Sequence, residues 1–279
     1  MVVRQHGRPG GALIAAVAVA GLITGATGCS ESGAAAETVD PGDPVDAVHR
    51  AAGELIRAGS SKARTSMEMA TGGTRVTIRG QGVYDYKDRL GQLRVMLPQD
   101  PTGADGHRPI TELLAPGALY MKNRGAGVPA DKWVRVDTAT LSDGNLVTGG
   151  ATDPLAAAEL LRGAEKVTFV GETEVAGVPV RHYRGTTDLT RAAKVSSAET
   201  GRALAAAAKG FSRTDVPFDA YLDHQGRIRK LRHEFSFTNA GRKETVAVAS
   251  TTLLYDFGAP VSVRLPDERD IFAGKIAEP

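Results

Sequence analysis

The chain has 279 residues, 42% of them hydrophobic, which is enough to build one large domain around a core of ordinary size. It carries 34 Lys and Arg against 32 Asp and Glu, and because Arg4 and Arg8 are the only charged residues before position 29, the remainder has no net charge. The sequence shows no clustered basic excess of the kind that nucleic-acid binding requires, so we predict no nucleic-acid partner.

The first 28 residues have the pattern of a secretory signal peptide. A short basic stretch is followed by a small, aliphatic run from Gly11 to Ile23, which is shorter than the roughly 20 residues of a membrane-spanning helix. The chain's single cysteine, Cys29, follows Ala26-Thr27-Gly28, which resembles a lipobox with Ala26 in place of the usual leucine. We therefore predict that residues 1–28 are removed and that Cys29 is lipidated. The alternative is an ordinary secretory signal followed by a chance cysteine.

Residues 29–43 are rich in Ser, Ala, Gly, Asp and Pro and show no apolar periodicity, which is typical of a flexible tether. The expected location is the extracytoplasmic face of the cell membrane, held there by the lipid on Cys29. With its one cysteine used by the anchor, the chain forms no disulfide, and residues 44–279 must be stabilised by their core as a single domain.

Apolar residues recur at helical spacing over 44–58, which predicts an amphipathic helix that stops at Gly59. From Thr65 the period changes to two, which indicates half-buried antiparallel strands, nine to eleven in all. Besides those through Met67, Val76 and Leu93, strands are expected at 118–122, 132–137, 166–174, 179–188, 217–223, 228–237 and 244–257.

Two further helices interrupt the strands. One starts at Asp153-Pro154, a helix cap followed by a proline at the first position, and the longer one covers about 188–209 before Gly210. Gly- and Pro-rich stretches at 98–109, 124–130 and 142–152 predict loops. Such a sheet must close into a barrel or curl around helices that cover its concave face.

Four segments, in order and spacing, resemble the LppX/LprAFG family of actinobacterial lipoproteins. They are 118–137, 153–189, 216–235 and 255–271. The resemblance implies a LolA-like α+β fold, a curved antiparallel half-barrel whose concave face is covered by helices and encloses an apolar cavity. It also implies acylated lipid or glycolipid as the bound partner, with a role in lipid trafficking. Fold alone does not establish lipid carriage.

Strand alternation predicts which side chains face the cavity, although a shift of one residue would turn each outward. The predicted cavity residues are Met67, Met69, Val76, Ile78, Leu93, Val95, Leu97, Leu119, Met121 and Trp133. Trp133 is expected at a sheet edge or at the cavity mouth. For these residues, ordinary core packing is the competing interpretation.

The sequence contains no recognisable catalytic or metal-binding motif. The six histidines are widely spaced, and there is neither a nucleophile elbow nor a phosphate-binding glycine loop. His182 is expected to be structural, and Asp153, Asp223 and Asp256 to be helix-cap, turn or strand-end residues. We expect no metal and no cofactor.

The leading hypothesis is a non-enzymatic, membrane-anchored lipoprotein that shields the acyl chains of a lipid, with an envelope transporter as a further partner. One alternative is a protein-interaction or sensor-accessory module with the same fold and no cargo. The other is an envelope hydrolase whose catalytic residues are dispersed along the chain.

Overall fold

The protein is described by a computed structural model covering residues 42–71, 73–98, 108–125, 127–239 and 244–274. These residues belong to one compact unit, Pro41–Pro279. The predicted signal peptide, Cys29 and nearly all of the predicted tether lie outside the described residues.

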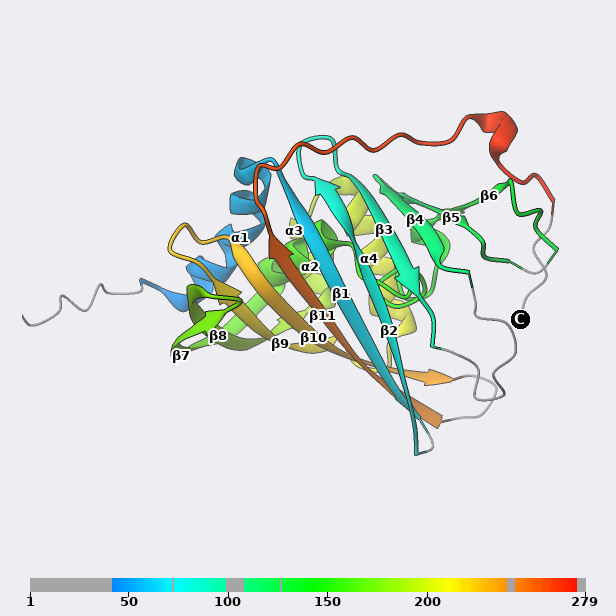
Figure 1. Ribbon diagram of the computed structural model, residues 1–279. Helices are drawn as coiled ribbons and strands as arrows, with labels where there is room; N and C mark the ends of the chain where they lie inside the picture. The colour runs from blue at the N-terminus through cyan, green and yellow to red at the C-terminus, as the bar shows by residue number, and fades with distance from the viewer. Residues whose placement is uncertain (1–41, 72, 99–107, 126, 240–243, 275–279) are drawn as a thin grey trace, which may run out of the picture. The chain divides into compact units, whose positions relative to one another are not determined.

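The described residues of this unit form eleven strands and four α-helices (Figure 1). In chain order they are α1 (Pro44–Ala58), β1 (Ser60–Thr71), β2 (Thr74–Asp85), β3 (Leu90–Met96), β4 (Ile110–Ala115), β5 (Ala118–Lys122), β6 (Trp133–Asp137), α2 (Pro154–Leu160), β7 (Ala164–Val175), β8 (Val178–Asp188), α3 (Leu189–Val195), α4 (Ala198–Gly210), β9 (Asp215–Leu222), β10 (Ile228–Asn239) and β11 (Glu244–Tyr255). Short 3₁₀ turns occur at Thr138–Thr140, Leu161–Gly163 and Glu268–Asp270.

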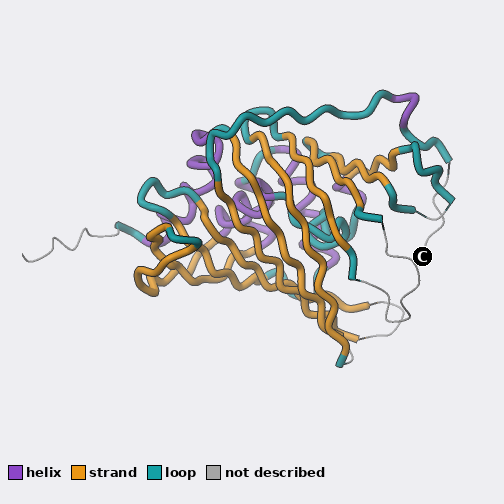
Figure 2. The backbone as a smooth tube through the Cα atoms, in the orientation of Figure 1, coloured by secondary structure: helices purple, strands orange, loops and turns teal. Residues whose placement is uncertain are grey.

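All eleven strands form one antiparallel sheet in the order β6-β5-β4-β3-β2-β1-β11-β10-β9-β8-β7. The two outermost strands, β6 and β7, do not pair with each other, so the sheet is open. The helices lie together on one side of the curved sheet (Figure 2). The predicted half-barrel with helices over its concave face is therefore confirmed.

Helix α1 begins and ends where the sequence predicts. Asp43 accepts a hydrogen bond from the Val45 backbone N–H at 2.8 Å, Pro44 occupies the first turn, and Gly59 ends the helix with a φ of 81°. Its apolar face, with Val48 and Leu55 fully buried, packs against β7 and the turn before it. The helix thereby covers the β7 end of the concave face.

The single long helix predicted over 188–209 is wrong, because the chain forms two helices there. Ser196 is extended, with φ −81° and ψ 171°, and separates α3 from α4. The Ser197 hydroxyl donates to the Glu159 carboxylate at 2.8 Å, and the Ser196 hydroxyl donates to the Glu159 backbone carbonyl at 3.4 Å. Serines that bond outside their own helix favour such a break, and here they lie against a buried carboxylate of α2.

After β11 the chain continues as an extended segment toward β6 (Figure 1). Near its start the Gly258 backbone N–H donates to the Ser60 carbonyl, and near its end the Phe272 N–H donates to the Trp133 carbonyl at 2.8 Å. This segment links the centre of the sheet to its edge strand.

Candidate functional site

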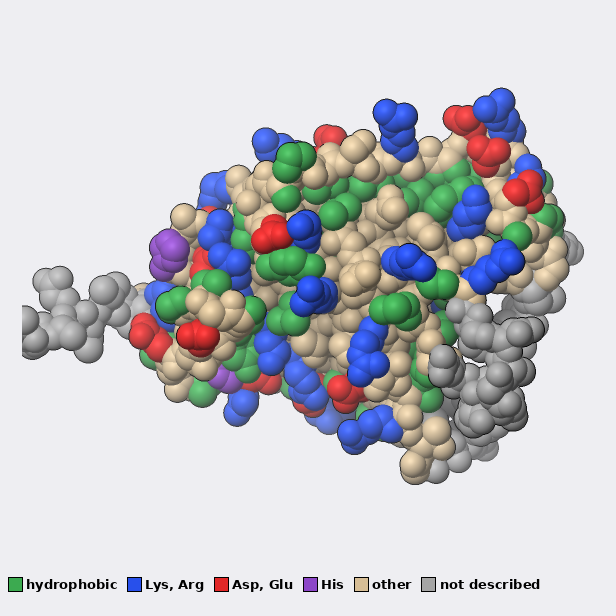
Figure 3. Space-filling view, in the orientation of Figure 1, with side chains coloured by type: hydrophobic (Ala, Val, Ile, Leu, Met, Phe, Trp, Pro, Cys, Tyr) green, Lys and Arg blue, Asp and Glu red, His purple; other side chains and the backbone are tan. Residues whose placement is uncertain are grey.

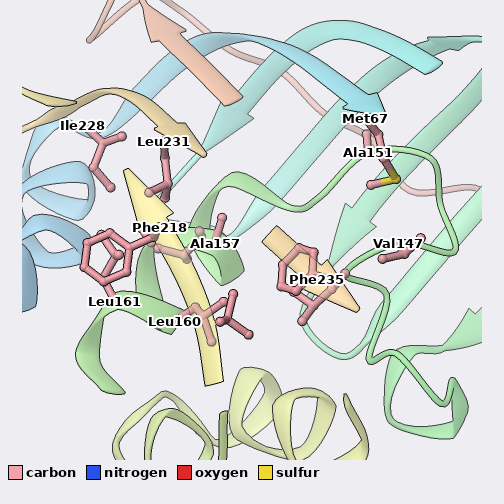
Figure 4. Packing of buried hydrophobic residues seen from close by; sticks show 14 of the residues in the cluster. Met67, Val147, Ala151, Ala157, Leu160, Leu161, Phe218, Ile228, Leu231 and Phe235 are labelled. Atoms are coloured by element: carbon pink, nitrogen blue, oxygen red, sulfur yellow. The ribbon is translucent and has the colours of Figure 1, made fainter. Parts of the chain in front are cut away.

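The candidate site is the interior between the concave face of the sheet and the helices. One continuous cluster of buried apolar side chains fills it, drawn from almost every strand and helix. Figure 4 shows side chains of β1, α2, β9 and β10 pointing toward one another there. Helix α2 is the most enclosed of the helices, with Leu155, Ala157, Ala158 and Leu160 at 2% exposure or less.

Nine of the ten predicted cavity residues face this interior. Met67, Ile78, Leu93, Val95, Leu119 and Met121 belong to the buried cluster, while Met69, Val76 and Leu97 are partly buried and pack against it. Strand alternation therefore assigned the correct face to these nine. Whether they contact a lipid stays a prediction.

Trp133 lies at the start of the edge strand β6, half-buried, and Val134 is the β6 residue that enters the cluster. The Lys122 ammonium lies 5.5 Å from the centre of the Trp133 ring, on the outer face of the sheet. The expected position at the sheet edge is thus confirmed. Unlike the other nine predicted residues, however, Trp133 points to the outer face of the sheet and not into the interior. The sequence WVRV alternates in a way that fits either phase.

A Gly-rich segment, 141–152, packs directly on the concave face. We call it the interior loop. A Cβ atom at Gly150 would lie 3.2 Å from Ile78 and 3.3 Å from Val95, so the backbone itself touches β2 and β3. The sequence predicted a loop here but gave no sign that it is buried, because short polar and glycine residues are typical of surface loops.

Hydrogen bonds to its own residues hold the interior loop in shape. Asp143 accepts from the backbone N–H groups of Asn145, at 3.1 Å, and Val147, at 2.8 Å. At the other end, Thr152 shares a hydrogen bond with Ser250 of β11, with an Oγ1–Oγ distance of 2.7 Å. These polar groups of the loop are thus paired within the loop or with β11, and the loop still lies against apolar strands.

Four buried side chains on the concave face have polar atoms without a hydrogen-bond partner among the described residues. They are Thr65, Glu112, Tyr183 and His233, from β1, β4, β8 and β10. Buried polar atoms are nearly always paired in proteins, so each unpaired atom calls for a partner from outside the chain or for a functional reason. The sequence analysis identified none of the four as a candidate site residue. Thr65, Tyr183 and His233 are polar residues within strands whose buried side chains are mostly apolar, and β4, which carries Glu112, was not predicted as a strand.

Glu112 is the most unusual of these residues. It is fully buried, both carboxylate oxygens are unpaired, and burial raises its pKa to about 8 against a small opposing effect of Arg124. A Cβ at Gly149 would lie 3.3 Å from each oxygen, so the carboxyl group sits directly beneath the interior loop. At neutral pH this group is mostly protonated and can donate a hydrogen bond.

His233 is 1% exposed, and burial lowers its pKa to about 3, so the imidazole is neutral. Its ring lies 6.3 Å from Phe218 and 5.8 Å from Phe235, centre to centre. It therefore adds a neutral polar group to an aromatic part of the interior.

The three aspartates predicted to be helix-cap, turn or strand-end residues have those structural roles. Asp153 caps α2 by accepting from the Leu155 and Ala156 N–H groups, as predicted. Asp223, fully buried in the β9–β10 turn, accepts from the Arg227 and Arg229 guanidinium groups at 2.9 Å. Asp256, just after β11, pairs with Lys62 at 2.8 Å. Within the described part of the chain, no group of three His, Cys, Asp or Glu side chains is arranged to hold a metal ion.

His182 lies on β8, where its Nε2 is 2.6 Å from an Asp219 carboxylate oxygen and its ring stacks on Tyr221 at 4.3 Å. Asp219 also accepts from Arg184 at 2.9 Å, and although burial opposes the effect, these two partners hold its pKa below the usual value. The stacking on Tyr221 and the hydrogen bond to Asp219 hold the His182 ring in place on the sheet.

Several hollows open on the described surface. Two of them have volumes of about 320 and 490 Å³; the first lies over β9, β10, β11 and β1, and the second between α4 and residues 139–142. A narrower one of about 50 Å³ lies beside Arg89 and Asp153. None of the ten predicted residues lines these three hollows.

No protein-family model matches the chain, and no curated protein matches it. Similar solved structures include LppX from Mycobacterium tuberculosis, at 10% identity and a TM-score of 0.43 over 78% of this chain and 99% of that one. LprF from Mycobacterium bovis shows 12% identity and a TM-score of 0.38 over 80% and 96% of the two chains. A LolA-superfamily protein from Nitrosomonas europaea shows 11% and 0.33 over 82% and 97%. Two of these three carry names from the group that the sequence resembles.

No helix among the described residues is long and apolar enough to cross a membrane.

Proposed function

We propose that this chain is a membrane-anchored extracytoplasmic lipoprotein, without enzymatic activity, that binds an acylated lipid or glycolipid between its sheet and its helices. The lipid on Cys29 would hold it at the membrane, and residues 44–279 would form the lipid-binding domain. In this role the protein shields acyl chains from water during their movement through the cell envelope.

The observation that carries the proposal is the set of unpaired polar atoms in a largely apolar interior. Apolar side chains supply the burial that acyl chains need, about 0.8 kcal/mol for each methylene group. The Glu112 carboxyl, the Thr65 hydroxyl and the His233 ring supply donors and acceptors that the protein leaves unused. An ester, hydroxyl or sugar group of a lipid could bond to them.

Room for acyl chains requires part of the interior contents to move. The interior loop suits this role, because Gly149, Gly150 and Ala151 are its contacts with β2, β3 and β4 and have little or no side chain. Its displacement would uncover Ile78, Val95 and Glu112 together. We infer that this loop is the gate to the interior.

The decisive experiment is native mass spectrometry with lipid extraction on residues 41–279, expressed without the anchor in the envelope of a related bacterium. This unit contains the whole of the described core. Lipid with two or more acyl chains, co-purifying at near-unit occupancy, is the expected result. If the purified protein contains no lipid and also fails to bind added lipids, the proposal is refuted.

A reversible lock tests the gate. A Cβ at Gly80 would lie 3.6 Å from the Ala151 Cβ, which is within disulfide range. We therefore suggest G80C and A151C combined with T65A, since the Thr65 hydroxyl would otherwise lie 2.4 Å from the new Cβ. The oxidised protein should lose acyl-chain binding, and the reduced form of the same protein should regain it. If both states bind acyl chains, and bind them equally, the entrance lies elsewhere.

The alternative function is a protein-interaction module that holds no lipid. The observation in its favour is that the hollows of about 320 and 490 Å³ lie outside the apolar interior. An empty protein that captures an envelope protein by cross-linking would support it.

A further inference from the structure

The outer face of the sheet, opposite the helices, carries a row of side chains that crosses nine strands in continuous register. We call it the basic row. From β9 to β6 its members are Tyr221, Lys230, Leu253, Arg64, Gln81, Arg94, Thr111, Lys122 and Trp133. Every second strand from β10 to β5 contributes a cation, and no member is acidic. Neighbouring cations are therefore about 10 Å apart.

Aromatic rings lie beside most of these cations. The Lys230 ammonium lies 5.0 Å from the centre of the Tyr221 ring, and Lys122 lies 5.5 Å from Trp133. The Arg64 guanidinium lies 5.1 Å from the Tyr255 ring. Tyrosine and tryptophan, with an apolar body and a polar tip, thus flank the row at both ends.

The cations of the basic row are not neutralised by the protein. None of the four has an ion pair with a carboxylate among the described residues, and Arg64 and Arg94 are exposed. The neighbouring row adds the exposed Arg79 and the 43%-exposed Met96. Figure 3 shows Lys and Arg side chains spread over this face, with fewer acidic ones.

We propose that this face docks on the surface of an anionic phospholipid bilayer. Its charge is complementary to acidic headgroups, and each Lys or Arg near such a surface adds favourably to binding. The tyrosine and tryptophan rings and the exposed Met96 match the headgroup region, where amphipathic rings and partly apolar side chains are favoured. A soluble acidic partner would need the cations but not the aromatic and apolar side chains.

Docking concerns the outer face and is separate from lipid binding in the interior, so either can fail alone. The test is co-sedimentation of residues 41–279 with vesicles of phosphatidylcholine, compared with vesicles in which a third of the lipid is phosphatidylglycerol. We expect binding to the anionic vesicles only, weakening as salt is raised.

The test variant is R64Q combined with R94Q. It should bind the anionic vesicles about fivefold more weakly for each arginine removed, or roughly thirtyfold in total. The matched control is R202Q with K209Q, which removes the same charge from exposed positions of α4, on the helical side of the sheet. It should bind as the wild type does.

Three outcomes would overturn the proposal. The first is equal binding to neutral and anionic vesicles, and the second is equal weakening by both double variants. The third is a protein that does not bind the vesicles but binds polyglutamate in a manner that depends on Arg64 and Arg94. That result would indicate that this face binds an acidic protein. Circular dichroism of each variant confirms that it is folded.

Discussion

Replacement of Glu112 by glutamine should change how stability depends on pH. Glutamine has nearly the same shape as a protonated glutamate and cannot ionise, so E112Q removes the titration and keeps the volume. In the folded wild type the pKa of Glu112 is raised to about 8 from an ordinary value of 4.5. The folded state therefore binds the proton more tightly than the unfolded state, and stability falls as pH rises between these two values.

The magnitude follows from the same linkage. Each pH unit within that window costs about 1.4 kcal/mol of unfolding free energy. The pKa of His233, lowered from 6.5 to about 3, has the opposite effect, because stability then rises with pH up to 6.5. The two effects offset each other between pH 4.5 and 6.5, so of these two groups only Glu112 contributes between pH 6.5 and 8, where the expected loss is about 2 kcal/mol.

Urea unfolding at pH 6.5 and pH 8 measures this difference. The wild type should lose about 2 kcal/mol between the two pH values, and E112Q should stay level. The control is E68Q, which changes an exposed glutamate on the outer face of β1 and should follow the wild type. If E112Q loses as much as the wild type, the carboxyl group is not buried in the way described.

Two further pairs of substitutions test a buried ion pair and the packing of two strands. D223N should destabilise the protein by about 3 kcal/mol in urea unfolding, because it leaves the Arg227 and Arg229 guanidinium groups without their buried counter-ion. The control is D267N. It should have little effect, because the aspartate side chain of that ion pair is 71% exposed. If D223N and D267N lower the free energy of unfolding by similar amounts, the Asp223 ion pairs contribute no more to stability than an exposed pair does. G82A should cost about 3 kcal/mol, because its Cβ would lie 1.8 Å from the Gln92 carbonyl oxygen of β3. G53A lies in the interior of α1, where only the Arg57 side chain is within 4 Å of the new Cβ, so it should stabilise the protein by about 1 kcal/mol. A G82A protein that melts at a higher temperature than G53A would contradict the register of β2 and β3.

The sequence by itself determined the local structure. Helix α1, the Asp153 cap and ten of the eleven described strands follow from spacing and capping residues, which depend only on neighbours along the chain. Strand β4 was not among the predicted strands. The inward phase of the strands through Met67, Ile78 and Leu93 follows from alternation for the same reason. The long helix over 188–209 was predicted wrongly, since the buried Glu159 that the two serines contact lies almost forty residues away along the chain.

Only the tertiary structure decided which residues meet. The sequence of the interior loop is typical of a surface segment. Only the structure shows that Gly150 packs against Ile78 and Val95. The Glu112 pKa depends on burial beneath that loop, which its neighbours on β4 do not reveal. The basic row draws residues from nine strands, one from each, so no local window shows a basic excess. Strand register, a long-range property, places them in one line.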